Sequence, residues 1–376
     1  MKRRRLLRGS PQFFALLLIA CAFSSLAHAR AAELEQRLLY VVEPGIRDYV
    51  KYGGAGILVF DIDRGHRFVK RIETPASRVE KPENIKGVCA SAATGRLYFT
   101  TLTRLYCLDL KNNEPLWDKA LPGGCDRMAL TPDGRRLYVP SLEGPHWNVV
   151  DAVDGNLITK IETKSGSHNT VCSPDGSRVF CAGLKSPLLS VVDPKTNEIV
   201  EKVGPFGAAI RPLTVNADAS RVYVNVNGLL GFEIGDTATG KMIERVEIKD
   251  YKQGPTMRHG CPCHGIGLSP DGRELWLCDS FNKRLHVFDV SASPAKQVGG
   301  IALRDEPGWV TLSIDGRFAY PSTGEVIDTA ARKIVATLED EKGRAVESEK
   351  LLEIDFRGDA VSRAGNQFAV GAIEAK

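Results

Sequence analysis

The segment Thr131-Pro132-Asp133-Gly134-Arg135-Arg136-Leu137-Tyr138-Val139 decides the fold, because its first four residues recur along the chain. Pro-Asp-Gly favours a tight turn, and the apolar residues around it favour β-strands. Close copies of the tetrapeptide begin at Ser173, Ser269 and Ser313, and degenerate copies begin at Ser91, Asn216 and Asp355. In chain order the seven copies begin 40, 42, 43, 53, 44 and 42 residues apart. The chain is therefore a series of structural repeats.

Each repeat contains enough strand signals for one blade of a β-propeller. Two strands flank the turn, and a third strand ends in an Asp that lies 18 residues after the turn Asp in three repeats, at Asp151, Asp193 and Asp289. A fourth apolar stretch follows, as at 157–161. Four short strands cannot bury both faces of their sheet unless neighbouring repeats pack on either side. Strands that end in Asp occur seven times, at Asp61, Asp109, Asp151, Asp193, Asp236, Asp289 and Asp328. We therefore expect an all-β, seven-bladed propeller.

The two ends of the chain supply the incomplete repeats. The first Asp-terminated strand has no turn motif before it, and the last turn motif has no such strand after it. We expect residues 351–356 to form the innermost strand of the blade that also contains 38–42, 57–61 and 68–72. Such a closure removes free sheet edges.

The repeat, with Ser-Pro-Asp-Gly before Leu-Tyr-Val and Val-Val-Asp, resembles the YVTN family of propeller repeats, which are WD-like. The resemblance covers nearly all of the chain after residue 29 and implies the fold. It implies little about chemistry, because that superfamily includes binding scaffolds, lactonases, a streptogramin lyase and subunits of quinohaem enzymes.

The first 29 residues are typical of a signal peptide. Basic residues precede the apolar run 13–23, and Ala27-His28-Ala29 is a small-residue cleavage site. We therefore expect a single propeller domain over 30–376 in the periplasm or outside the cell. An alternative is a lipid anchor at Cys21, because 18–21 resembles a lipoprotein box.

Removal of residues 1–29 takes away five of the 50 Lys and Arg and none of the 46 Asp and Glu, which leaves a formal charge of −1. Without a basic tail or stripe, nucleic acid is not an expected partner. No later apolar stretch is long enough to span a bilayer, so no transmembrane segment is expected.

A ring of polar residues is predicted at one mouth of the central channel. The innermost strands all end at their turns, so residues at a fixed offset before the turns lie at one level. The fifth residues before the seven motifs are Lys86, Asp126, His168, Arg211, His264, Gly308 and Lys350. Six of the seven are ionisable, and concave mouths with converging polar groups favour ligands. The excess of cations over Asp126 predicts a small anionic ligand, such as a carboxylate or a phosphate.

Loops next to this ring supply further candidates. The loop 254–263 accounts for the one spacing of 53 residues, and we expect its Arg258 and His259 to cover the ring; the alternative is that it only packs over a wider gap. Glu306, in a loop of another blade, is a candidate acid or base. Three residues directly follow ring positions in the sequence and are candidate ligand contacts or structural links: Arg127, Asn169 and Trp309.

The cysteines and histidines leave a metal site and a disulfide open. Cys261-Pro262-Cys263-His264 is one residue short of the motif for covalent haem attachment. His168, His259 and His264 are candidate metal ligands. Cys125 is a candidate disulfide partner for Cys261 or Cys263, and the other cysteines are expected to be buried hydrophobic residues.

We favour binding of a small anion or of a partner protein at the charged mouth. The first alternative is a hydrolase or lyase resembling the propeller lactonases, metal-assisted or based on histidine. In it His168, His264, Asp126 or Glu306 would act as acid or base, and Arg211 with Lys86 would stabilise negative charge. The second alternative is an accessory propeller subunit of a periplasmic redox enzyme, which the resemblance alone suggests. No motif identifies a cofactor.

Overall fold

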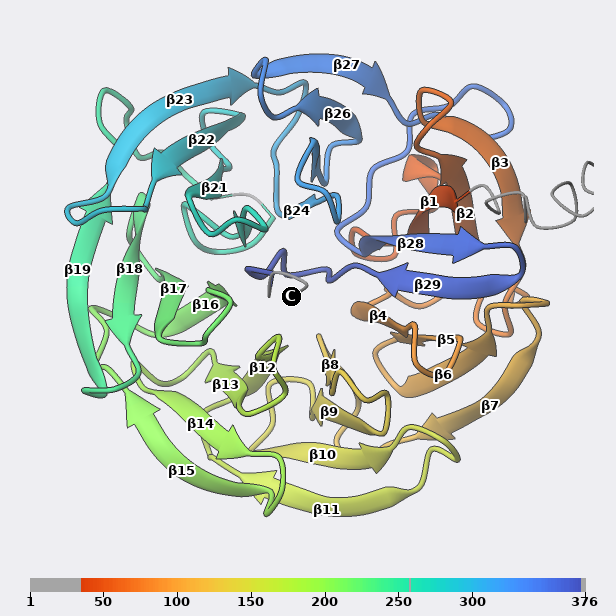
Figure 1. The fold of residues 1–376 in the computed structure, drawn as a ribbon, viewed down its shortest axis with the longest axis horizontal. Helices are drawn as coiled ribbons and strands as arrows, with labels where there is room; N and C mark the ends of the chain where they lie inside the picture. Colours follow the sequence, from red (N-terminus) through yellow and green to blue (C-terminus); the bar gives the residue numbers. More distant parts are fainter. Residues whose placement is uncertain (1–34, 257, 373–376) are drawn as a thin grey trace, which may run out of the picture. The chain divides into compact units, whose positions relative to one another are not determined.

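The chain folds into a ring of seven antiparallel sheets (Figure 1). The computed structural model describes residues 35–256 and 258–372, and the helical structure within them is one short 3-10 helix, η1 (Val50–Tyr52). The expected seven-bladed β-propeller is confirmed. The predicted signal peptide, with Cys21, lies outside the described residues. No helix in the described part of the chain is long and apolar enough to cross a membrane.

Six of the blades have four strands each, and their strands follow one another in the sheet in sequence order. The first three of these blades contain β4 (Gly87–Ser91), β5 (Arg96–Thr100), β6 (Arg104–Asp109) and β7 (Pro115–Ala120); β8 (Ala129–Leu130), β9 (Arg136–Pro140), β10 (His146–Asp151) and β11 (Leu157–Glu162); and β12 (Ser167–Cys172), β13 (Val179–Gly183), β14 (Leu189–Asp193) and β15 (Glu198–Val203). The next three contain β16 (Ile210–Val215), β17 (Arg221–Val226), β18 (Gly231–Asp236) and β19 (Lys241–Glu247); β20 (Ile266–Leu268), β21 (Glu274–Asp279), β22 (Arg284–Asp289) and β23 (Lys296–Ala302); and β24 (Val310–Leu312), β25 (Phe318–Pro321), β26 (Glu325–Asp328) and β27 (Lys333–Thr337).

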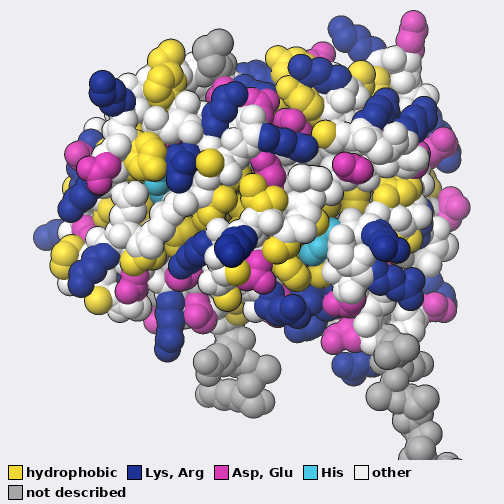
Figure 2. Space-filling model, turned by 90° about the horizontal axis from the view of Figure 1, so that it is seen from above, with side chains coloured by type: hydrophobic (Ala, Val, Ile, Leu, Met, Phe, Trp, Pro, Cys, Tyr) yellow, Lys and Arg dark blue, Asp and Glu magenta, His cyan; other side chains and the backbone are white. Residues whose placement is uncertain are grey.

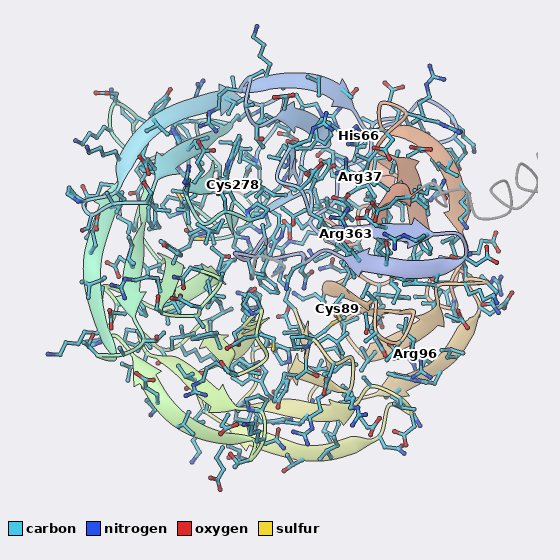
Figure 3. All side chains as sticks on the ribbon, in the orientation of Figure 1. Arg37, His66, Cys89, Arg96, Cys278 and Arg363 are labelled. Atoms are coloured by element: carbon cyan, nitrogen blue, oxygen red, sulfur yellow. The ribbon has the colours of Figure 1, made fainter. Side chains whose placement is uncertain are left out.

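The seventh blade joins the two ends of the described chain. β28 (Leu351–Arg357) pairs with β1 (Glu35–Glu43) in antiparallel register, and β2 (Gly56–Asp61) and β3 (Arg67–Ile72) complete the outer side. The predicted closure is therefore confirmed. The expectation that β28 is the innermost strand is wrong, because β29 (Ala360–Ala364) turns back and pairs with its free edge, which gives this blade five strands. Figure 3 shows Arg37 and Arg363 in this blade, where they pair with Glu353 and Asp355.

The turn motifs have the local chemistry that the sequence indicates. In the repeat at Ser173, the Ser hydroxyl donates to the Asp175 carboxylate at 2.6 Å, and the same carboxylate accepts the backbone N–H of Ser177 at 2.9 Å. Gly176 has a φ of 69°, a conformation that glycine adopts without steric cost. The same Ser/Thr-to-Asp hydrogen bond recurs in the repeats at Thr131, Ser269 and Ser313. The motif therefore fixes the hairpin between the first two strands in these four blades.

The hydrophobic core lies between the blades. Inner and middle strands are buried on both faces because a neighbouring blade packs on each side, whereas outer strands such as β19 and β23 alternate between exposed and shielded residues. Trp147, Trp276 and Trp309 are among the largest fully buried side chains. The interior therefore depends on the ring as a whole.

After β29 the chain runs into the middle of the ring (Figure 1). Backbone hydrogen bonds tie this tail, residues 365–372, to three blades: Gly371 donates to Val215, Leu268 donates to Ala369, and the Trp309 indole donates to Gln367. The tail therefore fills the axis at the level of the innermost strands, and a site at the mouth above it has a floor.

Candidate functional site

A cavity of about 380 Å³ lies where the innermost strands begin. Six of the seven blades or the segments leading into them contribute to its wall, and it is lined by Arg47, Asn84, Lys86, Arg127, Glu143, His168, Leu184, Arg211, Thr256, Arg258, His259, Gly260, His264, Glu349 and Lys350. Five residues of the predicted ring are among them: Lys86, His168, Arg211, His264 and Lys350. The sixth ionisable one, Asp126, is fully buried directly behind the wall. Residues at the fifth position before the turn motifs therefore lie close together in the structure. Their functional role stays a prediction.

Asp126 holds two residues of the wall. Its carboxylate accepts a hydrogen bond from Nδ1 of His168 at 2.6 Å and lies 3.2 Å from Nζ of Lys86. Burial alone would raise the pKa of Asp126, but His168 and Lys86 together lower it below its usual range. Burial outweighs the carboxylate at His168 and lowers the pKa of the imidazole. The imidazole of His168 is therefore neutral. Its Nε2 atom has no partner among the described residues and can accept a hydrogen bond at the cavity.

Glu349 is the second buried carboxylate of the site. It forms an ion pair with the Arg127 guanidinium, accepts a hydrogen bond from Nζ of Lys350 at 2.9 Å, and lies 2.9 Å from Nε2 of His259. Burial would raise the pKa of Glu349, but Lys350, His259 and Arg127 lower it well below its usual range. The ionised carboxylate of Glu349 is therefore the shared negative partner of three basic side chains.

Lys350 is buried as deeply as Glu349, with 2% of its surface exposed. Its Nζ also donates to the backbone oxygen of Gly45 at 3.0 Å. Burial and the charge of Arg127 outweigh the attraction of Glu349 and lower the pKa of Lys350 to about 7. A large fraction of this amine is therefore uncharged near neutral pH.

His259, from the loop 254–263, occupies the place in the ring of residues where Gly308 has no side chain. A Cβ atom at Gly308 would overlap Nε2 of His259 and would lie 2.5 Å from Oε1 of Glu349. The imidazole of His259 therefore lies where a side chain from that blade would stand. It stacks on His264, with ring centroids 4.2 Å apart and planes at 23°. The loop 254–263 supplies part of the wall itself, through His259 and Gly260.

His264 is a second neutral acceptor. Its Nδ1 donates to the backbone oxygen of Gly308 at 2.9 Å, and burial with the nearby His259 and Arg127 lowers its pKa well below the usual range. Its ring centroid lies 6.4 Å from that of His168. Two imidazoles whose Nε2 atoms can accept hydrogen bonds therefore stand side by side at the cavity.

The cavity has an excess of positive charge. Six Arg and Lys side chains line it against two carboxylates, so an excess of positive charge remains even when Lys350 is uncharged. Nε of Arg211 donates to the neutral amide of Asn227 at 2.5 Å, and Nη2 of Arg47 donates to the backbone oxygen of Arg258 at 2.6 Å. Among the described residues neither Arg211 nor Arg47 has a carboxylate within ion-pair distance. On the face visible in Figure 2, by contrast, basic and acidic side chains are interspersed.

Besides Asp126, three predicted residues do not line the cavity. Trp309 is fully buried below Arg127, whose guanidinium lies 4.4 Å from the ring centroid, so Trp309 supports the floor. Asn169 is buried in β12, where successive side chains point to opposite faces. Glu306 accepts the backbone N–H of Arg258 at 3.0 Å and so anchors the loop.

Arg258 itself reaches the cavity but is largely committed to loop contacts. Its guanidinium pairs with Asp305 at 2.5 Å and donates to the Tyr52 hydroxyl at 3.1 Å. The sequence reasoning missed Leu184 and four polar lining residues, Arg47, Asn84, Glu143 and Glu349. Only Glu349 carried a usable signal, because it directly precedes the ring residue Lys350.

All eight cysteines of the described chain are free, and Figure 3 shows Cys89 and Cys278 inside the blades. The alternative of a disulfide from Cys125 is therefore wrong. Burial raises the pKa of the Cys125 and Cys261 thiols to about 12, as expected for inert buried residues. Within the described residues, no group of three or more His, Cys, Asp or Glu side chains is arranged to hold a metal ion.

Comparison with known proteins supports the fold. No family model matches the chain, and no curated protein matches it, so the YVTN resemblance is not confirmed at the level of a family. Among solved structures, the periplasmic gluconolactonase PpgL of Pseudomonas aeruginosa matches with a TM-score of 0.63 and 18% identity, over 84% of this chain and 97% of that one. The chain adopts a β-propeller fold.

Two further solved structures are similar to the chain. The dihydro-heme d1 dehydrogenase NirN matches with a TM-score of 0.60 and 15% identity, over 88% of this chain and 73% of that one. A hydrazine synthase of Kuenenia stuttgartiensis matches with a TM-score of 0.45 and 15% identity, over 70% and 97%. At these identities the PpgL and NirN matches carry the fold and leave the chemistry to the site.

Proposed function

We propose that the cavity binds a small anion, a carboxylate or a phosphate, as the principal function of this protein. The observation that carries the proposal is the uncompensated charge of Arg211 and Arg47 at a concave, walled site. Guanidinium groups whose donors are not saturated by carboxylates bind such anions through strong charge-assisted hydrogen bonds. The Nε2 atoms of His168 and His264 would accept hydrogen bonds from hydroxyl groups elsewhere on the ligand.

Isothermal titration calorimetry with a panel of organic acids and sugar phosphates tests this proposal. For a ligand that binds, Arg211→Ala removes charge-assisted hydrogen bonds of about 1.5–3 kcal/mol, so the dissociation constant rises roughly 10- to 100-fold. Arg178→Ala is the matched control, because Arg178 is exposed at a turn and donates only to the backbone of Ser177. The proposal fails if no anion binds or if Arg211→Ala binds as tightly as the wild type.

We also propose a location for this binding, in the periplasm or outside the cell. The support comes from the signal-like residues 1–29, which lie outside the described part, and from the similarity to PpgL, a periplasmic gluconolactonase. Fractionation of cells that express the full chain, with and without residues 2–29, tests the location. A full-length chain that stays in the cytoplasm contradicts it.

A second candidate function is hydrolysis of a lactone or ester, and one observation favours it. The buried Asp126 carboxylate orients His168 at 2.6 Å, and the Nε2 atom of that ring is free at the cavity. An imidazole held in this way can take a proton from water as a general base, while Arg211 and Lys86 stabilise the developing negative charge.

Hydrolysis of glucono-1,5-lactone and simple aliphatic lactones, followed by pH-stat titration, tests the second candidate. Asp126→Asn is expected to lower kcat by roughly 10²- to 10⁴-fold, the range for loss of general base catalysis, with a smaller effect on KM. Asp154→Asn, at an exposed turn, serves as the control. Absence of hydrolysis above the buffer rate for every lactone removes this candidate and leaves anion binding untouched.

A further inference from the structure

We infer that the amine of Lys350 forms a reversible imine with the carbonyl carbon of a 2-oxo acid bound in the cavity. The inference rests on the proposed anion site, which would hold the carboxylate of such a compound, and it names both a reactive group and a substrate class.

The position of Nζ suits a nucleophile. The side chain lines the cavity, yet only 2% of the residue is exposed, so bulk water has little access to it. Two hydrogen bonds, to the Gly45 backbone oxygen at 3.0 Å and to Glu349 at 2.9 Å, fix the nitrogen. An amine nitrogen offers three directions beyond its carbon, so one remains for an incoming carbonyl group.

The charge of the amine is suppressed by its surroundings. Arg127 approaches the same carboxylate, Glu349, and His259 lies on its other oxygen, so Lys350 receives only part of the compensation from one negative charge. Burial and Arg127 lower the pKa of Lys350 to about 7. Buried lysines with suppressed charge are the ones that act as nucleophiles towards carbonyl compounds.

The neighbours of Lys350 match the other parts of a 2-oxo acid. Arg211 and Arg47 offer unpaired guanidinium groups for the carboxylate at the same cavity. The neutral imidazoles of His168 and His264 stand at the wall, where they can accept a hydrogen bond from the hydroxyl group of the carbinolamine. A ligand with an anionic group next to a carbonyl group therefore satisfies both kinds of residue.

The reaction is balanced without any further reagent. The nitrogen lone pair of the uncharged amine attacks the carbonyl carbon, and one N–H proton moves to the former carbonyl oxygen, which gives the carbinolamine. The C–O bond then breaks as the C=N bond forms, and the oxygen leaves as water with the second N–H proton. No electron is gained or lost, and addition of water reverses both steps.

The other lysine of the cavity provides an internal contrast. Nζ of Lys86 forms an ion pair with Asp126 at 3.2 Å, and among the described lysines and arginines only Lys86 lies within ion-pair distance of that carboxylate, whereas Lys350 shares Glu349 with Arg127. The Lys86 side chain is also the more exposed of the two, at 13% against 3%. We therefore expect modification at Lys350 and none above background at Lys86.

Reductive trapping tests the inference. The full chain is incubated at pH 7 with glyoxylate, pyruvate or 2-oxoglutarate and with sodium cyanoborohydride, which reduces an imine to a stable secondary amine. Peptide mapping by mass spectrometry then locates the adduct. The expected result is one adduct on Lys350 with at least one of the three acids, at least 10-fold above any surface lysine. An adduct that is absent with all three acids, or spread over the surface lysines, overturns the inference.

Two variants and one competitor complete the test. Lys350→Arg keeps the positive charge and is expected to abolish the adduct, whereas Lys86→Arg keeps it. The location of the adduct in the wild type decides the question if Lys350→Arg does not fold. Oxalate, which cannot form this imine, should bind by calorimetry and protect Lys350. Oxalate binding without any trapping refutes the imine alone, whereas absence of binding for oxalate and all three 2-oxo acids refutes both the imine and the anion site.

Discussion

Replacement of Glu349 by alanine should be among the most damaging single changes near the cavity. The variant leaves Arg127 and Lys350 buried next to each other without their carboxylate, and it removes the anion from His259 as well. Breaking a buried ion pair by removing one partner costs about 3–5 kcal/mol, because the remaining charge is uncompensated. Lys350 can lose its proton to relieve part of this cost, but the Arg127 guanidinium cannot. We therefore expect a loss of roughly 3–5 kcal/mol in the free energy of unfolding.

Urea titration at pH 7, followed by tryptophan fluorescence, measures this loss by linear extrapolation. Glu73→Ala is the control, because Glu73 and its partner Arg78 are both more than 60% exposed and such pairs contribute at most about 1 kcal/mol. In the double variant Glu349→Ala with Lys350→Met, part of the lost stability should return, since one of the two cations is gone. A Glu349→Ala variant as stable as Glu73→Ala would refute the account of Glu349 as the shared counterion.

Two further predictions concern the same wall. Gly308→Ala places a Cβ atom against His259 and should cost about 1–3 kcal/mol in urea titrations, whereas Gly299→Ala, where the nearest atoms leave ordinary van der Waals distances, should cost less than 1 kcal/mol; equal losses would contradict the packing described for His259. Lys350→Met should flatten the dependence of stability on pH: the folded pKa of about 7 lies below the ordinary 10.5, so the unfolded chain binds more protons between these values, and the wild type gains up to about 1.4 kcal/mol per pH unit over that window relative to the variant. Parallel stability curves for the two proteins from pH 7 to 10 would show that Lys350 is not the titrating group.

The repeat was sufficient to predict the blades because its chemistry is local. A hydroxyl and a carboxylate two residues apart, as at Ser173 and Asp175, close the hairpin without help from distant residues, and the glycine that follows accepts the turn conformation. The tail after β29 has no such signature. Its position depends on contacts from several blades, such as Gln367 with Trp309 and with the backbone N–H of Val88, so no local pattern indicates it.

The offset rule placed most of the wall because the innermost strands start at one level around the axis. It did not reach Arg47, which lies in the loop before η1, and the next offset selected Asn169, which is fully buried and does not line the cavity. The loop 254–263 was expected to cover the ring. Its His259 instead lies within the wall next to Gly308, where a side chain at that ring position would stand. A single sequence does not reveal that a residue from a loop takes this place in space.

The pairing of β28 with β1 joins residues more than 300 positions apart, as between Arg37 and Glu353. Until residues 351–357 have been synthesised, the growing chain cannot close into a ring, and the edge of β1 that pairs with β28 is unprotected. Glu349 and Lys350 belong to that same late stretch, so the cavity cannot be assembled before the circle is complete. A chain that stops short of Glu349 lacks two residues of the wall together with the strand that closes the ring.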